Sequence, residues 1–454
     1  MFLDEEKFRK RVWEINCPEM ILACRGERRR SRRFEGSGFV RCTEEGKIVF
    51  KVISRRPSCA VNILDFLHPG HVPGELIPEN EMFDLEAVDI GGRKWASQGI
   101  LPRILPATVG VLVEGSLSEI VHADARVAGG NSWLSLAFYG DYEIPCNDTP
   151  VTESREGVRL VNRSETLNVS RSKLSGHSLT ARYDQDRLRI DVQLTERDRQ
   201  VPPVLAARLE QALEFVFGQP MRAAVIEAVD GDGQKAWLRS ALPAHRSGGK
   251  IMPPLIEGKV GGSGDFWRLL DAFFCHIERD EGDSRPPISR HLQYLFVGNW
   301  SSFELQALAW STCVESILEY EYASAGGADP EFINGLNRAV GFVTKNEEGD
   351  TKERLLGILN SKRNASASEK LKQLVRDGVV REDQRKAWNG LRHRAAHGAM
   401  RELKLDNDRL LQCASVRTLA HCLVFHRIGY RGKFTDYGRR GAPTHGYPFA
   451  SDVP

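Results

Sequence analysis

Residues 187–217 read RLRIDVQLTERDRQVPPVLAARLEQALEFVF, and within this stretch the spacing of apolar residues changes. The first part has apolar residues at every second position, namely Leu188, Ile190, Val192 and Leu194. Such alternation is typical of a strand with one buried face. The second part has the spacing of an amphipathic helix, at Leu205, Leu209, Ala212, Leu213 and Val216. We therefore expect the chain to change here from strands to helices.

The region before this stretch favours strands. From about residue 34 to residue 194, apolar residues recur mainly at every second position. In one example the turn Glu44-Glu45-Gly46 is followed by Ile48, Phe50 and Val52. Short turns between alternating runs indicate antiparallel hairpins with one solvated face.

A segment rich in glycine, proline and serine over residues 243–265 favours a linker. Short strands near residues 223–228 and 236–238 are expected to complete the β-rich part before it. The sequence therefore predicts an α+β protein with a β-rich N-terminal domain over residues 1–245, a linker over 246–264, a helical domain over 265–437 and a C-terminal tail over 438–454.

The C-terminal part carries start and stop signals for helices. Ser301 with Glu304, and Ser366 with Glu369, have the spacing of capping boxes. The first box is expected to open a helix that runs to about Tyr322. Further helices are predicted over residues 381–396, before Gly398, and over roughly 406–428.

Length and composition fit a soluble protein with more than one core. The chain has 454 residues, 27% of them charged, and a formal net charge of +2. No signal-peptide pattern and no membrane-length apolar run is present, and the nine cysteines include no C-x-x-C pair. We expect a cytoplasmic protein with reduced thiols, no metal site, no cofactor and no membrane contact.

One candidate active-site motif lies in the predicted helix over residues 381–396. Arg392 is followed directly by the polar His393 and, after four intervening residues, by His397. The spacing alone is weak evidence, because it also occurs, with four or five intervening residues, at Arg171 and His177, Arg239 and His245, Arg285 and His291, and Arg440 and His445. Only the pair Arg392 and His397 lies in a helical pattern within an all-helical region.

With this motif, residues from about Gly264 to Tyr437 resemble the ApeA-like branch of the HEPN superfamily. That branch pairs the motif with an earlier helix carrying a glutamate, here Glu315, and a later helix running into a Gly-Tyr segment, here Gly429-Tyr430. The resemblance implies a metal-independent endoribonuclease that acts as a homodimer in bacterial antiviral defence by abortive infection. It also implies an N-terminal domain that senses a trigger, such as a phage product. His393 departs from the asparagine common at that position.

The residues suit RNA cleavage by the ribose 2′-hydroxyl. This reaction needs a base, an acid and a fixed cation at the phosphate. His397 suits acid-base work, which His393 could share, and the planar guanidinium of Arg392 can bind two phosphate oxygens. We predict catalytic roles for these three residues and Glu315, and RNA contacts for Arg394, Arg401, Arg431 and Lys433.

The geometry of a regular helix constrains this assignment. Arg392 and His397 would project about 140° apart, whereas His393 and His397 would share one face. The helix must therefore open near Gly398 for Arg392 and His397 to reach one phosphate. In the family that is resembled, two protomers bring their motifs together, which predicts a homodimer.

Alternative interpretations stay open for each feature. Arg392 and His397 could simply form a cationic last turn of a helix. Glu315 could stabilise the fold by pairing with an arginine of the motif helix. The basic run over residues 25–33 could track a phosphate backbone or be a solvated loop between strands. Tyr430, Phe434 and Tyr437 could pack a tail instead of stacking on bases. The whole helical domain could be a non-catalytic module that binds RNA or protein.

Overall fold

A computed structural model of the chain describes residues 12–26, 32–54, 76–107, 110–124, 132–140, 142, 144–146, 152–155, 158–161, 169–184, 187–195, 201–202, 204–240, 252–257, 264–280, 285–299, 301–326, 330–361, 365–396 and 407–449. The chain forms two compact units. The first comprises residues 1–206, 221–246 and 259–261, and the second comprises residues 207–220, 247–258 and 262–454. The units are therefore interleaved along the sequence.

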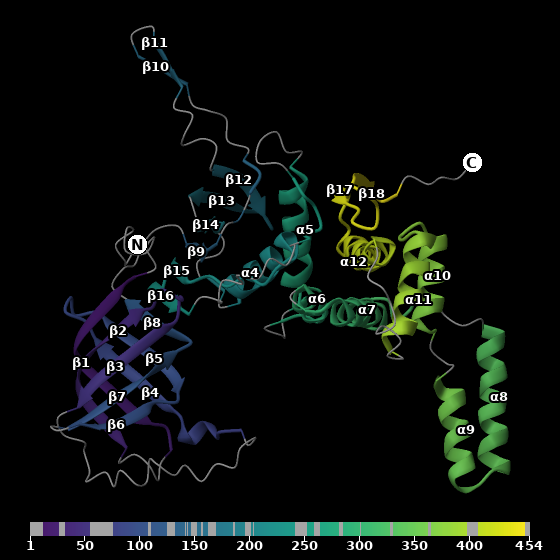
Figure 1. Cartoon of the computed structure of the whole chain (residues 1–454), viewed down its shortest axis with the longest axis horizontal. Helices are drawn as coiled ribbons and strands as arrows, with labels where there is room; N and C mark the ends of the chain where they lie inside the picture. Colours follow the sequence, from purple (N-terminus) through teal and green to yellow (C-terminus); the bar gives the residue numbers. More distant parts are fainter. Residues whose placement is uncertain are drawn as a thin grey trace. The chain divides into compact units, whose positions relative to one another are not determined.

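The first unit contains an antiparallel sheet of fourteen strands within the described residues (Figure 1). The strands are β1 (Glu14–Cys24), β2 (Arg33–Cys42), β3 (Ile48–Ser54), β4 (Phe83–Val88), β5 (Lys94–Ile100), β6 (Arg103–Ala107), β7 (Gly110–Leu117), β8 (Glu119–Asp124), β9 (Trp133–Tyr139), β12 (Val169–Leu174), β13 (His177–Asp184), β14 (Arg187–Gln193), β15 (Val225–Asp230) and β16 (Gly233–Arg239). Their order is β12-β13-β14-β9-β15-β16-β8-β5-β4-β1-β2-β3-β7-β6. A separate hairpin joins β10 (Thr152–Arg155) and β11 (Val158–Val161), and a short 3-10 helix, η2 (Glu79–Glu81), precedes β4.

The sheet curls so that strands distant in its order meet. Five strands separate β16 from β3 in the sheet, yet Ser240, directly after β16, contacts both β3 and β7. The Ile48 amide donates to the Ser240 hydroxyl oxygen at 2.9 Å, and that hydroxyl donates to the Leu117 carbonyl at 2.7 Å. Alternate residues of these strands then share one apolar core, which includes Leu22, Phe50 and Val113.

The first strand along the chain, β1, was not anticipated from the sequence, which predicted strands only from about residue 34. In β1, Cys17 pairs with Gly38 and Met20 with Gly36, so β1 carries one extra residue. The extra residue falls at Pro18 and Glu19, and a proline without an amide proton is tolerated at such a bulge. The bulge shifts the apolar residues out of strict alternation, which explains why the pattern was weak there.

The second unit is helical and ends in a small hairpin. Its elements are α4 (Leu205–Phe217), α5 (Asp265–Glu278), α6 (Pro287–Gly298), α7 (Phe303–Tyr320), α8 (Pro330–Asn346), α9 (Gly349–Ser361), α10 (Ala367–Arg376), α11 (Glu382–Ala396), α12 (Asn407–Ile428), β17 (Gly432–Thr435) and β18 (Thr444–Tyr447). The α+β class is confirmed. The predicted helices over 205–216, 381–396 and 406–428 correspond to α4, α11 and α12.

The helix α12 forms the centre of the second unit. Thirteen consecutive residues, from Cys413 to Phe425, are buried, so the helix is covered on every side. Its neighbours include α5, α7 and α11. By contrast, α8 and α9 lie side by side (Figure 1), and among their described side chains only Leu336 and Val343 are buried.

The placement of α4 corrects the predicted domain boundary. The sequence placed this helix in the N-terminal domain, but nearly all of it belongs to the helical unit. Phe215 of α4 stacks on Phe273 of α5 with ring centroids 4.6 Å apart, and Arg208 donates to the Asp280 carbonyl at 2.6 Å. Phe215 of α4 thus packs into the core of the helical unit.

The predicted linker and tail also differ from the structure, because their described parts bond to β17 or to Tyr437 shortly after it. In the linker range, the Ile256 amide donates to the Thr435 hydroxyl at 2.8 Å, and the Pro253 carbonyl accepts from the Tyr437 hydroxyl at 2.7 Å. In the tail range, β18 pairs with β17. Both segments therefore form part of the helical unit.

One capping box is confirmed and the other is wrong by one residue. Ser366 and Glu369 form a reciprocal capping box at the start of α10. At α7 the N-cap is Ser302, whose hydroxyl oxygen accepts from the Leu305 amide at 3.5 Å. Ser301 instead donates its hydroxyl to the Val297 carbonyl at 3.1 Å, near the end of α6.

Candidate functional site

Arg392 and Glu315 meet where α11 packs against α7. The Nε atom of Arg392 pairs with Oε1 of Glu315. About half of the Arg392 side chain and a third of the Glu315 side chain are exposed, at 51% and 33%. Within the described residues the Arg392 side chain makes no second ion pair. Its terminal amino groups can therefore bind an external anion while Nε holds Glu315.

The Arg392 guanidinium packs over the ring of Trp388. The guanidinium carbon lies 5.3 Å from the Trp388 ring centroid, a cation–π arrangement. The indole is completely buried and donates its N–H to the Ser311 carbonyl at 3.3 Å. The ring is thus held in place, and no sequence pattern indicated this role beyond the presence of a tryptophan in the motif helix.

Helical periodicity explains why these four residues come together. Ser311 and Glu315 are four apart on α7, and Trp388 and Arg392 are four apart on α11, so each pair occupies one face of its helix. Facing helices then place Trp388 against Ser311 and Arg392 against Glu315. The pairing matches the fold-stabilising interpretation of Glu315, and it also orients the guanidinium.

The remaining motif residues are located only in part. His393 and Arg394 lie in the last turn of α11, where the backbone but not the side chains is described. His397 and Arg401 fall outside the described residues, as does Gly398. The approach of His397 to Arg392 and the opening of the helix near Gly398 therefore stay predictions.

Arg431 and Lys433 lie on another part of the unit, at β17. Both side chains are exposed, and in the described part of the chain neither bonds to Arg392 or Glu315. The aromatic residues interleaved with them, Tyr430, Phe434 and Tyr437, are buried. Burial raises the pKa of the Tyr430 hydroxyl, which donates to the Lys433 carbonyl at 2.7 Å. These rings pack the C-terminal hairpin and are not available to stack on bases.

A buried carboxylate ties this hairpin to the start of the motif helix. Asp436 is completely buried and binds the Arg381 guanidinium at 2.7 Å, immediately before α11. The Gly438 amide also donates to Asp436, at 3.1 Å. Arg381 in addition lies over the Phe449 ring, 5.0 Å from its centroid. The end of the chain thereby helps to fix the position of α11.

The structure describes both ends of the basic run over residues 25–33. Arg25 pairs with Asp84 at 2.7 Å, and Arg33 pairs with Glu35, while residues 27–31 fall outside the described residues. The run connects β1 to β2, as the alternative interpretation proposed. Its two described ends are engaged in ion pairs within the first unit.

The thiols and acidic groups provide limited other chemistry. Burial raises the pKa of Cys413 and of Cys422 to about 12, which keeps both thiols protonated and poor nucleophiles.

In the part of the chain that the structure describes, no three histidine, cysteine or acidic side chains gather closely enough to hold a metal ion. Among the same residues, no helix combines the length and apolar character that crossing a bilayer requires.

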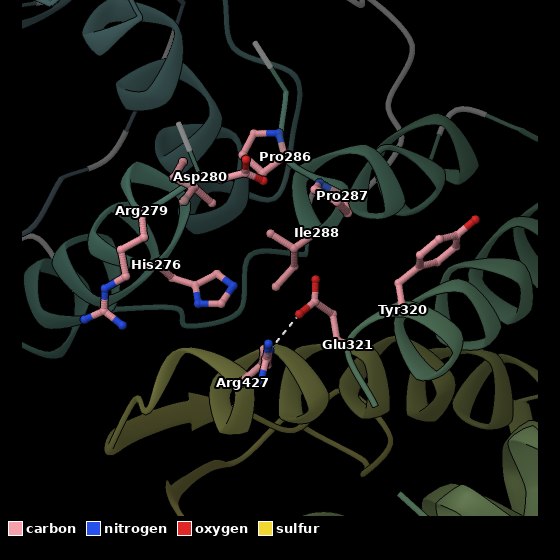
Figure 2. Close-up of a pocket in the computed structure, with 10 residues that line it drawn as sticks. His276, Arg279, Asp280, Pro286, Pro287, Ile288, Tyr320, Glu321 and Arg427 are labelled. Atoms are coloured by element: carbon pink, nitrogen blue, oxygen red, sulfur yellow. Dashed lines mark hydrogen bonds and ion pairs between the residues drawn. The ribbon is translucent and has the colours of Figure 1, made fainter. Parts of the chain in front are cut away.

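A cavity elsewhere in the helical unit was not anticipated from the sequence. It lies between α5, α6, α7 and α12 and includes His276, Glu321 and Arg427 (Figure 2). His276 and Glu321 are 45 positions apart, Arg427 is more than 100 positions from either, and no spacing pattern links the three. Comparison with known proteins adds no assignment, because the chain matches no protein-family model, no curated protein and no solved structure.

Proposed function

We propose that the protein is a HEPN-type endoribonuclease whose active site contains Arg392 and His397. The observation that carries the proposal is the held guanidinium: Arg392 is oriented by Glu315 on one side and by the buried Trp388 ring on the other. A half-exposed arginine in this position keeps donors free for a phosphate. A merely solvated arginine would have neither constraint.

In the proposed reaction the ribose 2′-hydroxyl attacks the adjacent phosphate. One histidine takes the hydroxyl proton, a second proton donor protonates the departing 5′-oxygen, and the P–O5′ bond breaks. The products are a 2′,3′-cyclic phosphate and a 5′-hydroxyl. Arg392 stabilises the extra charge on the phosphate oxygens, and His397 and His393 carry the protons.

The proposed active form is a homodimer. Near Glu315, α7 also exposes two apolar side chains, Leu305 and Leu308, at 56% and 45%. Leu308 lies seven positions before Glu315, about 20° away around the helix, and Leu305 lies ten positions before it, about 80° away on the adjoining flank. A second copy covering this face would bring two Arg392 side chains to one cleft, while Arg394, Arg401, Arg431 and Lys433 would contact RNA.

The β-rich unit is proposed to regulate this activity. In this proposal the protein acts in the bacterial cytoplasm, where a phage-derived trigger sensed by the first unit releases RNA cleavage that halts the infected cell. The interleaving of the two units supports such coupling, because α4 connects strands of the first unit to the core of the second.

The experiment that tests the proposal is RNA cleavage by the purified full chain in EDTA. Wild type is compared with Arg392→Ala, with His397→Ala and with a matched control, Lys386→Ala, an exposed cation on the same helix. We expect cleavage by wild type and the control, and a loss of about 100-fold or more in the two motif variants. A DNA strand of the same sequence, which lacks the 2′-hydroxyl, is expected to stay intact.

A second candidate function is supported by the same ion pair. Because Glu315 already neutralises Arg392, the pair could simply join two helices of a module that binds RNA or protein without cutting it. The assay separates the two functions. If the motif variants cut RNA as fast as wild type, the cleavage does not use Arg392 or His397 and the proposed active site is wrong. If no RNA is cut, even in the presence of a phage lysate, the non-catalytic function is the correct one.

A further inference from the structure

Within the part of the chain that the structure describes, Arg417 of α12 is a buried cation without a carboxylate partner. No part of its surface is exposed, and burial lowers the pKa of its guanidinium to about 10, so the group stays charged near pH 7. Its acceptors are the side-chain oxygen of Asn299 and, at 3.4 Å, the Gly218 carbonyl. A buried charge is stable only where nearby groups compensate its loss of hydration. The position of Arg417 therefore depends on these two acceptors.

The ends of two helices provide this compensation. Gly218 directly follows α4, and Asn299 is the C-cap residue of α6. A helix C-terminus carries about half a negative charge, so both ends attract a cation. The Asn299 side chain also donates to the Gly218 carbonyl at 3.2 Å, so the three residues form a closed set of hydrogen bonds. Arg417 thereby joins α12 to the ends of α4 and α6.

The same guanidinium covers the ring of Trp310 on α7. The guanidinium carbon lies 5.2 Å from the ring centroid. Trp310 is almost completely buried, and its indole N–H donates to the Leu295 carbonyl at 3.2 Å. The indole also lies so close to Gly298 that a Cβ at that glycine would meet the indole nitrogen at 2.6 Å. Trp310 is thus fixed between the end of α6 and Arg417.

The helix α7 connects this ring to the proposed active site. Ser311, the residue after Trp310, accepts the indole N–H of Trp388 with its carbonyl at 3.3 Å. Glu315, one turn later, binds Arg392, whose guanidinium lies over Trp388. A regular helix fixes the directions of its residues relative to one another. Fixing α7 at Trp310 therefore also sets where Ser311 and Glu315 meet α11.

We propose that Arg417 is a positioning residue for Arg392, and that it makes the orientation of Arg392 depend on the end of α4. The inference rests on the proposed function, since it names how the first unit reaches the proposed catalytic arginine. Along the chain, α4 follows β14 and precedes β15, and both strands belong to the first unit. A displacement of α4 moves the Gly218 carbonyl and, through Arg417 and α7, turns the Arg392 guanidinium.

The orientation of Arg392 can be measured in the full chain without any RNA. Its Nε–H group is paired with Glu315, and this pairing slows exchange of the proton with water. Side-chain NMR of the arginine Nε–H groups reports this exchange, and the Arg392→Lys variant assigns the signal. An Arg392 side chain that samples other orientations exchanges faster.

Substitutions of two buried arginines test the role of Arg417. Arg417→Met removes the guanidinium, and Arg417→Lys is a milder change that keeps the charge but not the planar group over Trp310. The matched control is Arg208→Met on α4, because Arg208 is almost fully buried and donates to a different carbonyl, that of Asp280. We expect exchange at Arg392 to be about tenfold faster in Arg417→Met, less accelerated in Arg417→Lys and unchanged in the control. Thermal melting checks that each variant is folded at the temperature of the NMR measurement.

A substitution at Gly218 tests the dependence on α4. Its φ of +67° disfavours a side chain, and an added Cβ would meet the Pro253 backbone at 2.9 Å, so Gly218→Ala must shift the end of α4. Gly264→Ala is the matched control, because Gly264 has a φ of +74° but an added Cβ there meets nothing within 4 Å. We expect Gly218→Ala to accelerate exchange at Arg392 in the wild-type background. In the Arg417→Met background it should add nothing, since the connection is already lost.

RNA cleavage provides a second readout. Arg417→Met is expected to lower kcat about tenfold and to leave KM unchanged, because Arg392 is proposed to stabilise the transition state. Arg208→Met should change neither constant. This split between kcat and KM separates a positioning role from a general loss of folded protein.

The NMR results decide the inference independently of cleavage. It is overturned if exchange at Arg392 is equally slow in wild type and Arg417→Met, or if Arg208→Met accelerates it as much. Additive effects of Gly218→Ala and Arg417→Met would refute the dependence on α4. If exchange changes as expected while wild type cuts no RNA, the positioning role stands and the proposed function fails.

Discussion

Glu315 of α7 and Arg392 of α11 form an ion pair whose guanidinium also covers the ring of Trp388. The pair therefore connects the motif helix to a helix that packs against the central α12. Both charges are partly exposed, so the pair contributes little to stability, about 0.5 kcal/mol. Its larger effect is on the direction of the guanidinium, and this effect can be measured.

Replacing Glu315→Gln is expected to reduce RNA cleavage more than it reduces stability. The amide can still accept a hydrogen bond but no longer holds the cation electrostatically, so Arg392 samples other orientations. We expect a loss of about tenfold in cleavage rate, with the free energy of unfolding lowered by less than about 1 kcal/mol. Urea unfolding and cleavage kinetics measure the two effects. Glu319→Gln, an exposed glutamate one turn later, is the control.

Two replacements at Trp388 separate the effect of its aromatic face from the effect of its hydrogen bond to Ser311. Trp388→Phe loses the hydrogen bond to Ser311 but keeps an aromatic face, whereas Trp388→Leu removes the face beneath Arg392. Both variants are expected to lose about 1 to 3 kcal/mol of stability, because the site is fully buried. Cleavage should fall about tenfold further in the leucine variant. Equal rates in the two variants would remove the ring from the mechanism.

Asp436 is expected to stabilise the unit through Arg381. Replacing Asp436→Asn leaves the Arg381 guanidinium without its buried partner and should cost about 3 kcal/mol. Hydrogen exchange of β17 and of the first turn of α11 should then accelerate. Asp408→Asn is the matched control, because Asp408 is exposed and lies 3.9 Å from Arg440. A variant of Asp436 as stable as that control would show that the contact is dispensable.

The helical unit should lose stability as the pH falls below about 6.5. His421 is completely buried among aromatic rings, and burial, reinforced by the nearby Arg417, lowers its pKa well below the usual value. Between the two pKa values the unfolded chain binds a proton that the folded chain does not, so stability rises with pH through this range. The folded state therefore loses up to about 1.4 kcal/mol per pH unit below 6.

The His421→Met variant tests this prediction, because methionine fills the space and does not titrate. Urea unfolding of both proteins at several pH values, followed by hydrogen exchange in α12, gives the difference in slope. Wild type should lose stability more steeply than the variant on acidification. Parallel slopes would mean that His276, His291 and His426, whose pKa values are also lowered, account for the effect.

A chain that begins at Gly262 is expected to misfold. Such a truncation follows the sequence-based boundary but removes α4, whose Phe215 packs against Phe273 and Phe425. It also removes the Gly218 carbonyl that accepts from Asn299 at 3.2 Å. Losing several buried apolar side chains, each contributing ~1.5 to 3 kcal/mol, exceeds a typical stability of about 5 to 15 kcal/mol. A cooperative thermal transition in the truncated chain would contradict this expectation.

Local sequence patterns predicted where strands and helices lie. They predicted less well to which of the two units each element belongs. The alternation at Leu188 to Leu194 and the helical spacing at Leu205 to Val216 were sufficient for β14 and α4. Gly218 directly follows α4, and its φ of +67° shows why glycine is needed there. A side chain at this position would also meet the Pro253 backbone at 2.9 Å. The unit to which α4 belongs depends on its partners, which no local pattern records.

The sequence by itself determined the α+β class, the approximate extents of α4, α7, α11 and α12, and the motif around Arg392, because these follow from periodicity and residue type along the chain. Only the tertiary structure decided that Arg392 is held by Glu315 and Trp388, and that His276, Glu321 and Arg427 line one cavity. Contacts between residues far apart in the chain depend on how helices pack, and one helical face is compatible with many partners.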